Sequence, residues 1–225
     1  VAPPSGSDPN PGFRFGFGAE GQTSTEGFTP GNLTEPANRL LQELANKAFI
    51  ISSVRGNVPF TVETRENPQW VGVHGENLLL LLAIIFGQRR HRHIAHRITE
   101  WGDRFGISEL HAGFRGSYQS GSDYRDSELG AVLDLALASS GARQILTVIT
   151  QLFWAPPGSL LMIEEPEISL HPKAQIDVLE MFAEAIKEGK QIIATTHSLI
   201  LLQALGYAVL KGWLTREEMA VYHVE

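Results

Sequence analysis

The sequence contains no cysteine, which excludes disulfide bonds and every metal site built on thiolate ligands. It also has no long apolar run, because the longest, from Leu78 to Phe86, is far shorter than the roughly 20 residues that a membrane-spanning helix needs. A basic segment followed by an apolar one, the pattern of a signal peptide, is missing from its start. These absences predict a cytoplasmic protein with no membrane partner.

An excess of positive charge is missing too, since 18 Lys and Arg face 25 Asp and Glu, for a formal net charge of -7. This balance argues against a dedicated nucleic-acid-binding module but permits a local basic patch. One basic run spans residues 88–97 and includes His91, His93 and His96. Its simplest interpretation is the solvated face of a helix. One alternative is that the run contacts nucleic-acid phosphates. Another is that the histidines bind a metal, although no neighbouring carboxylate completes such a site.

Composition divides the chain at about residue 36. Residues 1–36 are rich in Gly, Pro, Ser and Thr and show no sustained periodicity, which predicts a flexible segment. The aromatic stretch from Phe13 to Gly18 could stack on single-stranded nucleic acid, although a loop with a few aromatics is the simpler interpretation.

Apolar periodicity predicts regular structure from residue 37 onward. The predicted helices span residues 38–47, 76–86, 94–105, 142–154, 172–188 and 199–210. The predicted strands span residues 48–54, 131–138, 159–163, 191–195 and 220–224. Because helices and strands alternate in the second half, we expect an α/β fold with a mostly parallel sheet and flanking helices.

Two adjacent carboxylates end the apolar strand at 159–163. Ligands of open α/β sheets bind at the carboxyl ends of the strands, where Glu164 and Glu165 follow this strand. Adjacent strand residues point in opposite directions, so the two carboxylates are suited to different tasks. One can hold magnesium and the other can face a nucleophilic water; alternatively, they are an acidic turn after a core strand.

Polar residues occupy two further positions where a ligand could bind. His197 follows the strand at 191–195 and can donate a hydrogen bond to a phosphate oxygen, although a lone histidine there is more often structural. Ser139, Ser140 and Gly141 open the helix at 142–154, and the start of a helix can bind phosphate. Alone, this second position is an ordinary capped helix start.

The order and spacing of these three motifs resemble the ABC-type ATPases of the SMC/RecF-like AAA group, over roughly residues 48–225. The resemblance implies a signature motif at Ser139, Ser140 and Gly141, with a D-loop at Ser169, Leu170 and His171. It also implies that Glu164 serves magnesium, that Glu165 is the catalytic glutamate and that His197 is the switch histidine. Arg55-Gly56 and Gly75-Glu76-Asn77 are similar to a subgroup of AAA ATPases of unassigned role.

The family binds ATP and Mg²⁺ between two domains that dimerise head to tail, often in DNA repair, chromosome maintenance or phage defence. A homodimer is therefore implied, with nucleic acid as a possible partner. In these terms, residues 37–130 form a helical and strand insert of the ATPase domain, and residues 131–225 carry the signature, Walker B and switch-histidine part of the core.

The sequence departs from the family pattern in two respects. No G-x-x-x-x-G-K-(S/T) loop occurs in it, and Glu164 stands where Asp is usual. We therefore expect an incomplete P-loop NTPase domain, clipped at both ends, whose Walker A comes from a missing N-terminal segment or a partner domain. The alternative is a non-catalytic interaction module without its own P-loop.

Overall fold

The computed structural model describes residues 39, 42, 46–63, 67–115, 119–127 and 129–224. The segment 1–36, with its aromatic stretch, lies outside the described residues, as does most of the helix expected at 38–47. Within the described part, no helix has the length and apolarity needed to cross a bilayer.

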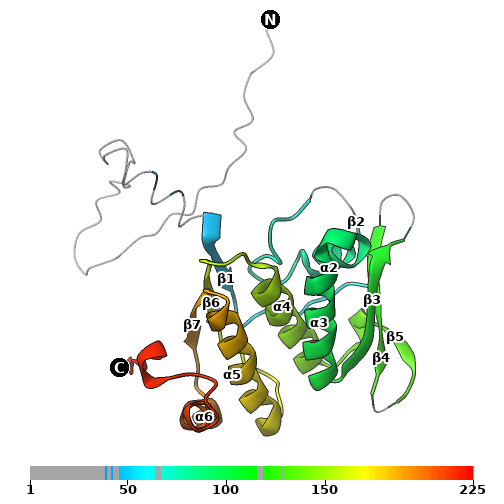
Figure 1. Cartoon of the computed structure of the whole chain (residues 1–225). Coiled ribbons are helices and arrows are strands. Elements are labelled where there is room, and N and C mark those ends of the chain that lie inside the picture. Colours follow the sequence, from blue (N-terminus) through cyan, green and yellow to red (C-terminus); the bar gives the residue numbers. More distant parts are fainter. Residues whose placement is uncertain are drawn as a thin grey trace, which may run out of the picture.

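A parallel sheet forms one side of the molecule (Figure 1). Its strands are β1 (Ala48–Ile51), β6 (Leu160–Glu164) and β7 (Gln191–Thr195), in the order β1-β6-β7. Leu161 and Ile163 of the central strand are buried, because every second side chain points towards the helices. The expected parallel sheet with flanking helices is thus confirmed.

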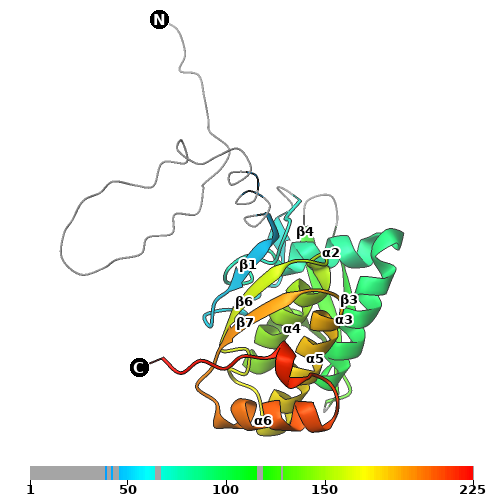
Figure 2. The ribbon, with the colours of Figure 1, turned by 60° about the vertical axis from the view of Figure 1, so that its left-hand side comes forward.

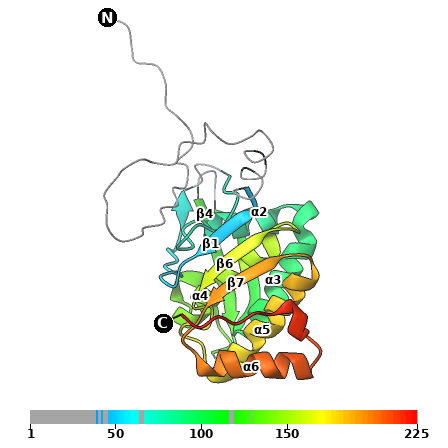
Figure 3. The same ribbon diagram turned by 90° about the vertical axis from the view of Figure 1, so that its left-hand side faces the viewer.

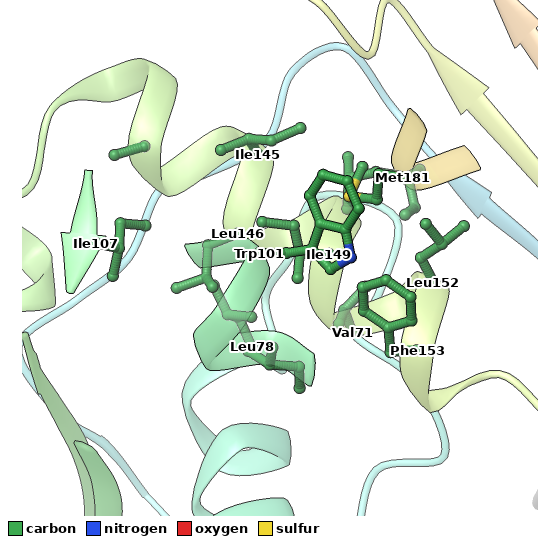
Figure 4. Packing of buried hydrophobic residues seen from close by; sticks show 14 of the residues in the cluster. Val71, Leu78, Trp101, Ile107, Ile145, Leu146, Ile149, Leu152, Phe153 and Met181 are labelled. Atoms are coloured by element: carbon green, nitrogen blue, oxygen red, sulfur yellow. The ribbon is translucent and has the colours of Figure 1, made fainter. Parts of the chain in front are cut away.

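A layer of helices separates this sheet from a second one (Figure 1). The helices are α2 (Leu78–Gly87), α3 (Arg92–Arg104), α4 (Ser140–Trp154) and α5 (Pro172–Lys187), followed along the chain by α6 (Leu199–Leu210). The main core lies in this layer. Figure 4 shows its residues Val71, Leu78, Trp101, Ile107, Ile145, Leu146, Ile149, Leu152, Phe153 and Met181.

The second sheet is antiparallel and was not expected from the sequence. It consists of β2 (Val62–Glu63), β3 (Ile107–Phe114), β4 (Gln119–Asp126) and β5 (Val132–Asp134), with β4 paired to the other three. The strand expected at 131–138 is shortened to β5, because the Asp134 carboxylate accepts a hydrogen bond from Ala136 N at 2.9 Å and starts the 3-10 helix Leu135–Leu137.

Residues 220–224 do not form the expected strand. The backbone is extended at Met219, and Val221 and Tyr222 are 65% and 85% exposed. A strand requires a neighbour that pairs its backbone groups, and none of the described strands pairs with this segment. The segment nevertheless runs back from α6 towards the side of the molecule where β7 lies (Figures 2 and 3).

Candidate functional site

The carboxyl edge of the parallel sheet brings polar residues from three strands together. Ile51 of β1 lies beside Ile163 of β6, and Glu164 lies beside Thr195 of β7. The segments that begin at Ser52, Glu164 and Thr195 therefore leave the sheet at the same level. As expected from the sequence, the glutamate pair and the loop that holds His197 share one edge of the sheet.

Glu164 is anchored by the first residues after β1. Its Oε2 accepts hydrogen bonds from Ser53 N at 3.0 Å and from Ser52 Oγ at 3.1 Å. The Ser53 amide, followed by the Ser52 hydroxyl, lowers the pKa of Glu164 below its usual value, so this carboxylate is charged at neutral pH. These bonds all go to Oε2, and Oε1 has no hydrogen-bond partner among the described residues.

Glu165 has a left-handed backbone, with φ of 41°, which is uncommon outside glycine. Its amide donates to the Thr195 carbonyl at 3.0 Å, so that β7 holds the start of this turn. The half-buried carboxylate makes no hydrogen bond or ion pair with the described residues. An unpartnered carboxylate on a constrained backbone is suited to bind a group that enters this edge.

A polar network joins the turn after Glu165 to the loop that contains His197. The Thr196 hydroxyl donates to Oε1 of Glu167, whose carboxylate is buried and whose Oε2 has no partner within the described part. Ser198 N donates to Thr196 Oγ1 at 2.9 Å, and Ser198 Oγ to Gln175 Oε1 at 2.6 Å. Ser198 also caps α6, because its hydroxyl accepts from Leu201 N at 3.2 Å. His197 itself is exposed.

The three residues assigned to the signature motif lie at the start of α4. Ser139 is the N-cap, and its hydroxyl accepts from Ala142 N at 3.2 Å. Ser140 is exposed, and its hydroxyl accepts from Gln144 Nε2 at 3.2 Å. Gly141 is buried. The two exposed serines place hydroxyls at the start of this helix, a position where an anion can bind.

Gly141 brings the start of α4 against the turn that contains Ser169. A Cβ on Gly141 would lie 2.4 Å from the Ser169 carbonyl oxygen, so only glycine permits this approach. Ser169 has a left-handed backbone, with φ of 61°. His171 caps α5, because its Nδ1 accepts from Lys173 N at 3.3 Å. The residues of the proposed signature and D-loop are therefore neighbours.

Arg55 is a member of this site to which the sequence analysis gave no role. It is 5% exposed, and its guanidinium donates to the carbonyl oxygens of Ser52, Glu164, Glu165 and Gln144. Burial lowers the pKa of Arg55 to about 10, although nearby carboxylates oppose this shift. The sequence singles out Arg55-Gly56 through its similarity to a subgroup of AAA ATPases but does not predict this role, since most of the partners are backbone atoms far away in the sequence.

The residues at this edge fit a magnesium ion only together with other ligands. No group of three His, Cys, Asp or Glu side chains within the described ranges could hold a metal ion. Glu164 offers one free carboxylate oxygen. Magnesium is usually bound by one or two carboxylates, several waters and the phosphates of a nucleotide, which is compatible with this sparse donor set.

The basic run at 88–97 lies at the junction of α2 and α3, at the other end of the helix layer (Figures 2 and 3). The His91 ring packs on Trp154, and Arg97 pairs with Glu184 at 2.7 Å. Burial, together with the charges of Arg90 and His93, lowers the pKa of His91 below its usual value. The described residues hold no metal cluster here.

Comparison with solved structures finds partial likenesses to Smc head domains. The Pyrococcus furiosus head is 16% identical over 51% of this chain and 31% of its own, with a TM-score of 0.43. The Pyrococcus yayanosii head is also 16% identical over 51% of this chain, with a TM-score of 0.43, but over 24% of its own length. The Thermotoga maritima head is 14% identical over 56% of this chain and 44% of its own, with a TM-score of 0.38. The chain thus spans less than half of each.

No curated protein matches the chain. A family model does: residues 34–203 match the family described as "AAA domain, putative AbiEii toxin, Type IV TA system". This range covers more than half of the 225 residues, including β1, both glutamates, the start of α4 and His197. The chain belongs to this AAA-domain family.

Proposed function

We propose that the chain is one part of an ATPase domain. It supplies the carboxyl edge of the parallel sheet, where ATP is hydrolysed, and the start of α4, which carries the signature motif. A P-loop segment without counterpart in these 225 residues completes the domain. The observation that carries this proposal is the pair of adjacent glutamates in different settings. Glu164 is hydrogen-bonded and charged, whereas the Glu165 carboxylate has no hydrogen-bond partner in the described part of the chain and stands on a left-handed backbone. Two such carboxylates at one strand end can divide metal binding and base chemistry between them.

In this proposal each residue has one task. Glu164 contributes Oε1 to the shell of Mg²⁺, which neutralises charge on the ATP phosphates when bound. Glu165 accepts a hydrogen bond from the attacking water and orients it towards the γ-phosphate. His197 donates a hydrogen bond to a γ-phosphate oxygen, and its neighbours Thr196 and Ser198 hold its loop in place.

A segment that carries the P-loop requires a place to dock, and the free side of β7 is suitable. β7 pairs only with β6 among the described strands, and Ile193 on it is 57% exposed. Native proteins rarely leave an apolar edge strand open. The extended segment 220–224 returns to the same side without a strand partner. We propose that the P-loop segment adds a strand along β7.

The start of α4 fits a role in a second copy of the chain. Ser139 and Ser140 are exposed at the start of α4, where a phosphate presented from outside can bind. We propose a head-to-tail homodimer in which Ser140 and Gly141 of one copy contact the γ-phosphate held by the other. Sedimentation of the full gene product should then give a dimer with ATP and Mg²⁺. A Ser140→Arg variant should stay monomeric.

Steady-state ATP hydrolysis by the full gene product tests the enzymatic proposal. Glu165→Gln should lower turnover about 100-fold or more, to a small residual rate, whereas Glu100→Gln, at an exposed site on α3, should leave it unchanged. A wild-type protein that is folded and does not hydrolyse ATP would refute it. The absent P-loop would then favour the second candidate, an interaction module that clamps a nucleotide held by another polypeptide.

A further inference from the structure

Arg55 uses all three nitrogens of its guanidinium to bind backbone carbonyl groups. Nη1 donates to Glu164 O at 2.7 Å and to Ser52 O at 2.9 Å, and Nη2 donates to Glu165 O at 2.9 Å. Nε donates to Gln144 O at 3.3 Å. None of these partners is a carboxylate, although the arginine is almost fully buried. An arginine arranged in this way holds segments of chain together rather than neutralising one acidic partner.

The carbonyl groups that Arg55 binds come from three elements of the site. Ser52 follows β1, Glu164 ends β6 with Glu165 directly after it, and Gln144 lies in the second turn of α4. α4 begins with the residues assigned to the signature motif, and the turn after β6 begins with the proposed catalytic glutamate. One side chain therefore connects the helix that faces the second copy with the backbone of the proposed catalytic glutamate.

Two backbone features show why this connection is tight. Glu165 is left-handed, a conformation that costs free energy and persists only where its surroundings enforce it. The Thr195 carbonyl fixes its amide, and Arg55 fixes its carbonyl. Gly56, with φ of 80°, lets the loop after Arg55 lie directly on α4, since a Cβ there would be 2.8 Å from the Gln144 side chain.

We propose that Arg55 is a positioning residue that couples the placement of α4 to the placement of the Glu165 carboxylate. The inference rests on the proposed function. One rigid, planar guanidinium fixes the position of the Gln144 carbonyl relative to those of Glu164 and Glu165. A second copy that binds the start of α4 therefore also acts on the backbone of the two glutamates. Hydrolysis then depends on the signature contact through Arg55, without any contact between Arg55 and ATP.

The test uses Arg55→Lys and Arg55→Met in the full gene product, with Arg97→Met as the matched control. Arg97 also joins two elements, since it binds Glu184 of α5 and Glu188 directly after that helix and lies over the Phe153 ring of α4, but it is remote from the sheet edge. A lysine keeps the charge and cannot bridge all four carbonyl groups. We expect kcat to fall about 10-fold or more in Arg55→Lys, with KM for ATP within about 3-fold of wild type. Arg97→Met should leave both constants unchanged.

A double-mutant cycle separates positioning from general damage. If Arg55 acts through Glu165, then Arg55→Lys added to Glu165→Gln should cause no further loss of the residual rate. If Arg55→Met does not fold, Arg55→Lys alone decides. A wild-type kcat in Arg55→Lys, or an equal fold-loss with and without Glu165→Gln, would overturn the inference while the proposed function stands. No hydrolysis in the wild type would overturn both.

Discussion

The carbonyl oxygen of Ser169 lies so close to Gly141 that a Cβ on the glycine would be 2.4 Å away from it. This contact joins the start of α4 to the turn after β6, within a few residues of both glutamates. Backbone atoms on both sides make the contact, and neither can move aside as a long side chain could. The two motifs therefore share one rigid junction, and its geometry depends on a single missing methyl group.

Gly141→Ala should disturb this junction and lower the free energy of unfolding by about 1–3 kcal/mol, because the added methyl group overpacks a closed contact. Urea denaturation followed by tryptophan fluorescence measures the change. Gly206→Ala is the matched control, since Gly206 lies in α6 and a Cβ added there would have nothing within 4 Å outside its own helix backbone. It should be neutral or stabilising by up to about 1 kcal/mol, as for a glycine inside a helix. Equal effects of the two substitutions would contradict the close contact.

Glu164 should contribute to stability in a pH-dependent way. Its pKa is lowered in the folded protein by the Ser53 amide and the Ser52 hydroxyl, so its contribution is present above the unfolded pKa of about 4.3 and disappears as the pH falls through the folded pKa. We expect Glu164→Gln to cost about 1 kcal/mol at pH 7 and progressively less below about pH 4. Unfolding measured from pH 7 to pH 3 tests this.

The control for that titration is Glu100→Gln, whose carboxylate is 66% exposed and lies 3.8 Å from His96. Its effect should be small throughout, because exposed ion pairs contribute little. If the cost of Glu164→Gln is independent of pH across this range, the two serines do not hold the carboxylate in the way described.

Thr196→Val should destabilise the protein by about 1–3 kcal/mol, because it removes the hydroxyl that donates to the buried Glu167 carboxylate. Thr99→Val is a like-for-like control: the Thr99 hydroxyl donates to the Ala95 carbonyl of its own helix, and its loss should change stability by less than about 0.5 kcal/mol. Thermal unfolding of both variants gives the comparison. A Thr196→Val variant as stable as Thr99→Val would show that the link between Glu167 and the His197 loop contributes nothing.

Backbone hydrogen exchange of β7 tests whether a further strand docks there. In the full gene product, peptides that cover Gln191–Thr195 should exchange more slowly than in the isolated 225-residue chain, since a new neighbour would pair the free edge of β7. Peptides from β6, which is paired on both sides, should exchange equally in both. Equal exchange of β7 in the two proteins would argue against docking at this edge.

The second half of the fold was accessible to sequence analysis because its elements are buried in a regular pattern. Leu160–Glu164 and Gln191–Thr195 are apolar runs with polar ends, and α5 and α6 were expected within one residue of their observed bounds. The β4 segment, Gln119–Asp126, contains serine, glycine and charged residues, and its pairing rather than its side chains makes it a strand. No periodicity could reveal it.

The candidate site, too, could be predicted from the sequence only in part. Glu164, Glu165 and the loop of His197 follow strands, and aligned parallel strands bring such residues to one edge. The role of Arg55 could not be predicted, although Arg55-Gly56 was singled out, because this side chain binds backbone carbonyl groups up to 110 residues away, which every residue type possesses. The expected strand at 220–224 failed for a related reason: its composition suits a strand, but none of the described strands pairs with it.

The measurement that tests the central claim most directly is phosphate release in a single turnover from ATP bound to the full gene product, compared between wild type and Glu165→Gln. ATP retained on the protein is measured in the same samples. If Glu165 orients the attacking water, the variant should retain ATP as well as wild type does and release phosphate about 100-fold more slowly or worse. Equal rates of phosphate release from equally bound ATP would contradict the account.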